Sequence, residues 1–301
     1  MKTLKELVID IHSHPTFTDF MQEGHKPPKP WQVNKKLDVV TDPSKMGIAM
    51  HLTSKQYKGQ QPKMFSVKDF KEHLSETHSL INFLCPLTKG QSAKESNEKA
   101  AKLIKQFGDK AIGFAGFDPN SDDPVGDIEY AVNELGFKGL KIIPSLLGLD
   151  VNDKRFYSCY EKIQELGVPI TIHTGAGLIM GCRISHVRPI LIDDVAFDFP
   201  GLKIIAAHMG CWDYMDVHSL MLRHTNVYSD LSAWPLDPVY TDLLPWKVLE
   251  QTVSDKLMLG SDYPAAQTPQ EALEAVNSLP VSEEFKRKIK GENAAKLLGI
   301  E

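Results

Sequence analysis

The chain has 301 residues, of which 42% are hydrophobic and 24% are charged, and its formal net charge is −5. This composition is sufficient for one large apolar core, and the weakly acidic balance gives no electrostatic basis for binding nucleic acid. No stretch is long and apolar enough to span a membrane, and the first residues lack the apolar region and cleavage site of a signal peptide.

The chain opens with an apolar run over residues 7–11 that leads into His12-Ser13-His14. From residue 66 onward, amphipathic runs of helix length alternate with short apolar runs of strand length. The further strands are expected at 80–85, 111–117, 139–143, 168–173, 202–208, 227–231 and 256–260. The helices are expected at 66–78, 92–107, 125–135, 156–166, 189–197, 214–224, 243–253, 269–279 and 285–298.

The opening strand and the seven later strands make eight units in which a strand precedes helical sequence. Continuous apolar strands that alternate with helices are typical of a parallel sheet covered on both faces. Eight such units in a chain of this length predict an α/β fold of the (β/α)8 TIM-barrel type. No linker marks a second domain, so we expect a single domain over residues 1–301.

The segment 15–65 departs from this alternation. It contains Lys26-Pro27-Pro28-Lys29-Pro30 followed by Trp31, and it is too long for an ordinary connection. Because it follows the first strand directly, we expect it over the mouth of the barrel as a lid or substrate-facing insertion. A surface elaboration or a contact between copies in a homo-oligomer is the alternative.

The strand ends carry a set of metal-binding residue types. His12 and His14 are two residues apart in a strand, so their side chains point the same way. His173 ends the fifth expected strand and Asp262 follows the eighth, and the C-terminal ends of barrel strands meet at one rim. Three imidazoles and a carboxylate predict one divalent metal ion, with Zn²⁺ preferred and Mn²⁺ or Fe²⁺ as alternatives.

Such an ion would bring the pKa of a bound water towards about 7. Asp262 is then expected to accept the proton of this water and pass it to a leaving group. His208, at the end of the sixth strand, is expected to polarise the carbonyl of the substrate. For His208 the roles of ligand, base and orienting donor stay open.

Four more residues are candidates for contacts with the substrate. Lys141 lies within the fourth strand and is expected to bind the substrate or an internal acid; a carboxylated Lys141 that bridges a second metal, held by His173 and His208, is the alternative. Arg183 lies in the loop after His173 and could hold a carboxylate in bidentate fashion, or form a loop ion pair. Trp212 and Tyr263 follow site residues directly and are expected to line the pocket.

The remaining polar residues receive structural interpretations. Asp230 ends the seventh strand and is expected to support a ligand. Six histidines fall in loops or on helix faces and are expected to be non-catalytic: His25, His51, His73, His78, His218 and His224. The cysteines, Cys85, Cys159, Cys182 and Cys211, form no close pair, so we expect reduced thiols in a cytoplasmic protein.

Five motifs in this order resemble the amidohydrolase superfamily, and within it the amidohydrolase-related branch of TIM-barrel metal-dependent hydrolases. They are Asp10-Ile11-His12-Ser13-His14, Ile172-His173-Thr174-Gly175, Ala207-His208-Met209-Gly210, Gly260-Ser261-Asp262-Tyr263-Pro264 and Asn293-Ala294-Ala295-Lys296-Leu297-Leu298-Gly299. The resemblance implies a single metal held at His12, His14, His173 and Asp262. It also implies that His208 is catalytic or adjacent to the metal.

The branch includes hydrolases and also non-oxidative decarboxylases of the aminocarboxymuconate-semialdehyde and resorcylate kind. We therefore expect a metal-dependent hydrolase of a small amide, ester or lactone that carries a carboxylate. The alternative is a decarboxylase in which Arg183 or Arg188 orients an unsaturated or aromatic carboxylic acid. A third possibility is a metal-binding protein without catalysis, which the complete set of ligand residues disfavours.

Overall fold

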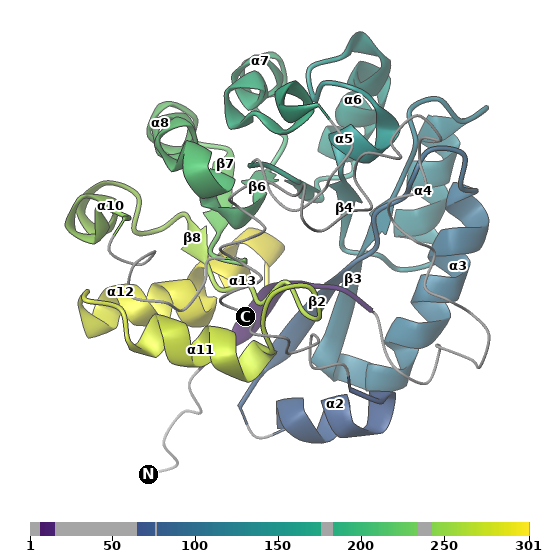
Figure 1. The fold of residues 1–301 in the computed structure, drawn as a ribbon. Coiled ribbons are helices and arrows are strands. Elements are labelled where there is room, and N and C mark those ends of the chain that lie inside the picture. Colours follow the sequence, from purple (N-terminus) through teal and green to yellow (C-terminus); the bar gives the residue numbers. More distant parts are fainter. Residues whose placement is uncertain (1–6, 16–64, 76, 176–182, 234–242, 301) are drawn as a thin grey trace, which may run out of the picture.

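The structure is a computed structural model that describes residues 7–15, 65–75, 77–175, 183–233 and 243–300. Its eight strands lie side by side in chain order, and each pairs with the next in parallel (Figure 1). The strands are β1 (Ile9–Ser13), β2 (Leu80–Leu84), β3 (Ala111–Gly116), β4 (Gly139–Ile142), β5 (Ile170–Ile172), β6 (Ile204–Ala206), β7 (Val227–Asp230) and β8 (Leu257–Met258).

The sheet returns to its own first strand. The amide of Ile11 donates to the carbonyl of Leu259 at 3.0 Å, and Ser13 forms a parallel bridge with Tyr263. These contacts bring the ends of β1 and β8 together. The predicted (β/α)8 TIM barrel is confirmed.

Helices surround the strands (Figure 1). They are α2 (Val67–Ser75), α3 (Ala93–Ile104), α4 (Pro124–Asn133), α5 (Pro144–Leu147), α6 (Tyr157–Glu165), α7 (Ile192–Asp198), α8 (Tyr214–Arg223), α10 (Trp246–Thr252), α11 (Pro269–Asn277), α12 (Glu283–Arg287) and α13 (Asn293–Leu298). None of the described helices has the length and apolarity needed to cross a membrane.

Local sequence explains where several helices begin. Ser92 caps α3 by accepting from the amide of Glu95, and Asp123 caps α4 ahead of Pro124. Thr268 and Glu271 form a reciprocal capping box at the start of α11. These side chains satisfy amides that have no partner within the helix.

The strands are buried because helices cover their outer faces. Every residue of β1, β2, β4, β5, β6 and β8 is buried. The main apolar cluster joins most strands to helices α2 to α11, and a second cluster joins β1, β2, β3, β6 and β8 to α13. The site residues therefore start from a rigid frame.

Several elements differ in extent from the predictions. β6 ends at Ala206 rather than at residue 208, and β8 ends at Met258 rather than at residue 260. Beyond β6, residues 208–211 have positive φ angles, which turn the chain out of the sheet. The last predicted helix is interrupted by a π-helical segment, Lys288–Glu292, between α12 and α13.

A short helix, α5, follows β4 and was not predicted, because four residues are too few to show a helical period. The segment interpreted as a lid or insertion falls largely on residues 16–64, which lie outside the described residues.

Candidate metal centre

His12, in β1, and His14, one residue after that strand, belong to one site. His12 is buried, and its Nδ1 lies 3.0 Å from Oδ2 of Asp230. The Nδ1 of His14 lies 2.9 Å from the carbonyl oxygen of Leu84, which can only accept a hydrogen bond. His14 therefore donates from Nδ1, and its Nε2, which faces Asp262, is the ring nitrogen that would bind a metal once it carries no proton.

Asp262 meets both histidines at the rim. Its Oδ1 lies 3.1 Å from Nε2 of His14 and 3.5 Å from Nε2 of His12. Its amide donates to the carbonyl of His12 at 2.7 Å, and its φ of 54° turns the chain at this point. His12, His14 and Asp262 thus offer ligand atoms within 4.8 Å of one another.

The electrostatics keep this carboxylate ionised. Burial raises the pKa of Asp262, but the hydrogen bond from His14 and the neighbouring His12 and His208 outweigh that effect and hold the pKa well below its usual range. An ionised carboxylate is the form that binds a metal and accepts a proton.

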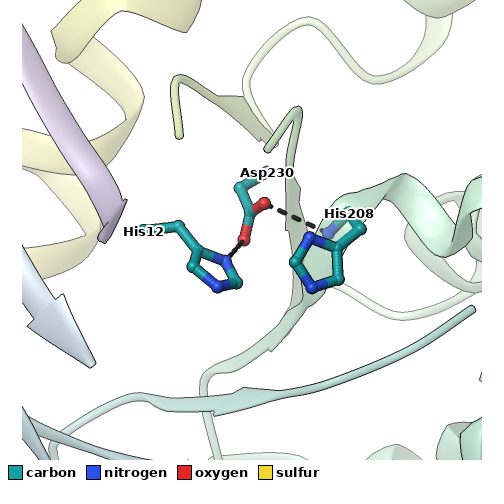
Figure 2. A group of neighbouring side chains, drawn as sticks. All are labelled: His12, His208 and Asp230. Carbon is teal, nitrogen blue, oxygen red and sulfur yellow. Dashed lines mark hydrogen bonds and ion pairs between the residues drawn. The ribbon is translucent and has the colours of Figure 1, made fainter. Parts of the chain in front are cut away.

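A second group, His12, His208 and Asp230, lies beside the first (Figure 2). The backbone amide of His208 donates to Oδ1 of Asp230 at 3.1 Å, and the rings of His12 and His208 are 4.6 Å apart. The imidazole of His12 and the hydroxyl of Ser232 also bond Asp230, and together they overcome burial and hold its pKa well below the usual range. Asp230 therefore contacts His12 directly, and its support of a metal ligand stays a prediction.

His208 links this group to His173. The Nδ1 of His208 lies 2.8 Å from the hydroxyl of Ser232, and its Nε2 lies 3.0 Å from Nδ1 of His173. The amide of His173 donates to the carbonyl of Ile142 at 3.0 Å, which anchors this residue to β4. His12, His208 and His173 thus form a row across the rim.

The donor set fits a divalent ion of the zinc or manganese type. The Nε2 atoms of His12 and His173 are buried and have no hydrogen-bond partner in the part of the chain that the structure describes. Burial lowers the pKa of His12 to about 3, and it also lowers the pKa values of His173 and His208. Neutral imidazoles with bare nitrogens are the form that metals require.

Lys141 places a cation next to this row. It is 1% exposed, and its Nζ has no hydrogen-bond partner among the described residues. Burial lowers its pKa to about 8, and the attraction of Asp230 and Asp262 opposes that shift. Since the register pairs Lys141 with Thr171 of β5, the lysine belongs to the wall of the barrel beside His173.

The other predicted substrate contacts are more scattered. Arg183 is exposed and precedes a short 3₁₀ turn, and Trp212 is 57% exposed. Tyr263 is fully buried; its ring lies 4.6 Å from that of Phe70, and its hydroxyl accepts from the amide of Phe65 at 2.7 Å. The contacts of Tyr263 are those of a core residue, and substrate binding by these three residues stays a prediction.

Asp10 is a site residue to which the sequence analysis gave no role. Its carboxyl accepts from the hydroxyl of Ser261 at 2.6 Å, from the amide of Ser261 at 3.0 Å and from the amide of His12 at 3.1 Å. It therefore ties the metal-site ends of β1 and of the segment after β8 to each other. Burial raises its pKa to about 7. The sequence feature that could have identified Asp10 is its place two residues before His12, which puts both side chains on the same side of the strand.

Close backbone packing surrounds the site. A Cβ on Gly260 would lie 2.9 Å from the Cβ atoms of both His12 and Ser232. A Cβ on Gly175 would lie 2.7 Å from the carbonyl oxygen of Gly210, and the φ of Gly175 is +86°. The glycines in the two motifs are therefore required by the close approach of neighbouring strand ends.

The histidines interpreted as non-catalytic lie outside the two groups wherever the structure describes them. His224 pairs with Asp193 at 2.6 Å, and His218 contacts the hydroxyl of Thr252 at 3.0 Å. His25 and His51 are outside the described residues.

One relative and two solved structures illustrate what this chain is similar to. A 2-keto-4-carboxy-3-hexenedioate hydratase from Sphingobium sp. (strain NBRC 103272 / SYK-6) is 28% identical over 137 residues, or 39% of this chain and 40% of that protein. The match therefore spans less than half of that relative's length. An uncharacterised TIM-barrel protein from Bordetella bronchiseptica has a TM-score of 0.70 at 20% identity, with 97% of this chain and 98% of that chain covered.

A 5-carboxyvanillate decarboxylase from Novosphingobium aromaticivorans, solved with manganese and 4-hydroxy-3-methoxy-5-nitrobenzoic acid, has a TM-score of 0.65 at 17% identity, with 98% of this chain and 96% of that chain covered. At these identities both structures establish the fold alone. The sequence model of the amidohydrolase family, in contrast, matches residues 9–300. Because that match covers nearly the whole chain, the chain belongs to the amidohydrolase family.

Proposed function

We propose that the protein is a metal-dependent enzyme that activates water against a small carboxylic acid, with hydrolysis of an amide, ester or lactone as the first candidate reaction. His12, His14, His173 and Asp262 would hold one divalent ion, with zinc preferred and manganese as the alternative. When bound, the ion supplies a Lewis acid that polarises a substrate oxygen and lowers the pKa of water.

The position of Asp262 carries this proposal. Its ionised Oδ1 lies between the Nε2 atoms of His14 and His12, at 3.1 and 3.5 Å. Its side chain is 13% exposed, so it remains within reach of a molecule that enters the rim. A carboxylate in this place can take a proton from water and return it to the leaving group.

His208 supports the same step by orienting His173. The Nδ1 of His208 is engaged by the hydroxyl of Ser232, and its Nε2 faces Nδ1 of His173. Polarising a substrate carbonyl requires a proton on Nε2, so His208 would perform that role only after it has taken up a proton.

Lys141 indicates the class of substrate. A buried ammonium group without a hydrogen-bond partner is unfavourable unless an anion neutralises it. A substrate carboxylate would satisfy Lys141 while the remainder of the molecule faces the histidines. Arg183 is the second cation that we assign to this carboxylate.

Decarboxylation is the second candidate, because the amidohydrolase-related branch that the motifs resemble includes decarboxylases; a 5-carboxyvanillate decarboxylase shares this fold. In that reaction, Lys141 or Arg183 would orient the carboxylate, a site acid would protonate the adjacent carbon, and CO₂ would leave. Asp262 would then hold the metal and relay a proton without activating water.

Turnover in ¹⁸O-labelled water separates the two reactions. The test uses purified protein of measured metal content and a panel of lactones, amides, unsaturated dicarboxylic acids and hydroxybenzoates. Hydrolysis places one ¹⁸O in the product, whereas decarboxylation places none and releases CO₂. Metal binding without turnover on the panel would support the non-catalytic alternative.

Asp262→Asn tests the assigned base on whichever substrate reacts. We expect kcat to fall by about 100-fold or more at saturating metal, with a much smaller change in KM. Exposed Asp122→Asn is the matched control and should keep the wild-type rate. A wild-type rate for Asp262→Asn would remove Asp262 from the mechanism.

A further inference from the structure

We infer that Asp230 and Ser232 are positioning residues that determine which ring nitrogen carries the proton in His12, His208 and His173. Asp230 ends β7 and Ser232 follows two residues later, so one strand end would prepare metal ligands that come from two others. The inference deepens the proposed function and rests on it for the role of His12 and His173 as metal ligands.

Asp230 acts only as an acceptor. Its Oδ1 accepts hydrogen bonds from the backbone amides of His208 and Ser232, each at 3.1 Å, and from the hydroxyl of Ser232. Its Oδ2 lies 3.0 Å from Nδ1 of His12. Because an ionised carboxylate has no proton to donate, the proton in this last contact belongs to His12 Nδ1.

Ser232 has one hydroxyl proton, and the contact with Asp230 uses it. Toward the Nδ1 atoms of His208, at 2.8 Å, and of His12, at 3.1 Å, the hydroxyl oxygen can therefore only accept. The backbone carbonyl of Ser232, 3.3 Å from Nδ1 of His208, also only accepts. Both imidazoles must carry their proton on Nδ1.

The tautomer of His208 in turn determines the tautomer of His173. A neutral His208 with its proton on Nδ1 has a bare Nε2, and this nitrogen lies 3.0 Å from Nδ1 of His173. His173 must then donate from Nδ1, which leaves its Nε2 bare. The chain of hydrogen bonds ends at Nε2 of His12 and at Nε2 of His173. Both nitrogens are buried, and neither has a hydrogen-bond partner among the described residues.

The same geometry argues against Asp230 as a ligand. His12, His208 and Asp230 also lie close enough to hold an ion. Both oxygens of Asp230 already accept hydrogen bonds, however, and an ion on them would displace the contacts that align His12 and His208. The network is complete as a support for ligands.

Asp230→Asn provides the sharpest test, because it keeps the shape and removes one acceptor. Three donors meet Oδ1, so the amide oxygen of Asn must face them and its NH₂ must face Nδ1 of His12. His12 Nδ1 must then accept, and its proton moves to Nε2. We expect His12 to change tautomer in the metal-free variant, while His208 and His173 keep theirs.

The readouts are ¹⁵N spectra of the imidazoles in metal-free protein and the affinity for added Zn²⁺ by calorimetry. We expect the affinity of Asp230→Asn to fall by about 10- to 100-fold, the range seen when a group that supports a ligand is changed. Ser229→Ala is the matched control, since Ser229 is buried on the same strand and its hydroxyl donates to the carbonyl of Ala206. It should keep both the tautomers and the affinity.

Ser232→Ala is the second variant, in case Asp230→Asn does not fold. Nδ1 of His208 would lose its hydroxyl acceptor at 2.8 Å and keep the longer contact with the carbonyl at 3.3 Å, so the spectra should show a smaller fraction of His208 protonated on Nδ1. An unchanged His12 tautomer in folded Asp230→Asn, with or without loss of metal, overturns the inference. Wild-type protein that shows the assigned tautomers but binds no metal would overturn the proposed function and leave the tautomer assignment standing.

Discussion

Lys141 is an unusual residue of the site, because its charged side chain is buried. Its ammonium group is buried in the barrel wall without a hydrogen-bond partner in the described part of the chain. Such a group destabilises the fold and is kept where function needs it. Its burial lowers its pKa to about 8, whereas the unfolded chain has the ordinary value of 10.5. The unfolded state therefore binds more protons between these values, and stability rises with pH across this window.

Lys141→Met should for this reason stabilise the metal-free protein. Below pH 8 the full penalty of the buried charge is present, on the order of 3 kcal/mol, and the variant removes it. The difference in the free energy of unfolding between the variant and wild type should shrink as the pH rises from 8 towards 10.5, because folded wild-type protein loses this charge over that range. Urea unfolding at several pH values measures the difference, with exposed Lys138→Met as the control. A stabilisation that does not vary with pH would show that packing, and not charge, is responsible.

At the scale of elements, the site depends on the junction where β8 returns to β1. β8 has only two residues, so its position is set by contacts beyond the strand. The carboxyl of Asp10 accepts from both the amide and the hydroxyl of Ser261, and the amide of Asp262 donates to the carbonyl of His12. Gly260 allows this approach because it has no Cβ.

Gly260→Ala should therefore damage the site and the fold together. The added methyl group would meet the Cβ atoms of His12 and Ser232 at 2.9 Å, and overpacking of this kind destabilises by about 1–3 kcal/mol. We expect weaker Zn²⁺ binding as well, since His12 is displaced. Denaturant unfolding and calorimetry measure the two effects.

Gly201→Ala is the control for this change. Its Cβ would meet the flexible end of Gln164 at 3.0 Å, which can move aside. Equal effects of the two substitutions would remove the special role of the junction.

At the scale of the whole molecule, the barrel brings distant parts of the chain to one point. His12 and Asp230 are hydrogen-bonded although 218 positions separate them, and Asp10 and Ser261 are 251 positions apart. An ion shared by His12, His14, His173 and Asp262 would link both ends of the chain. Since it binds the folded state alone, it should stabilise the entire barrel.

Added Zn²⁺ or Mn²⁺ should therefore raise the unfolding temperature of metal-stripped protein. At a free concentration 100 times the Kd, the expected stabilisation is about 2.7 kcal/mol, which corresponds to a shift of a few degrees. The shift should disappear in His12→Ala and persist in His218→Ala, whose imidazole contacts Thr252 away from the site. A shift that survives in His12→Ala would place the ion elsewhere.

What the sequence determined by itself was the order of elements and the residue types at the strand ends. Apolar periodicity and the two-residue spacing of His12 and His14 are local properties of the chain, so they predicted the barrel and the side of the strand on which a metal would bind. The positions of His173, His208 and Asp262 at later strand ends supplied the remaining candidates, and the family motifs imply the same residues.

Only the tertiary structure decided how these residues are connected. Ser232 carries no local signal, because its importance comes from contacts with His208, 24 positions away, and with His12, 220 positions away. Tyr263 follows Asp262 directly but packs against Phe70, since the positive φ of Asp262 turns the chain between them. Hydrogen bonds across a closed barrel depend on the register of its strands, and no window of the sequence contains both partners.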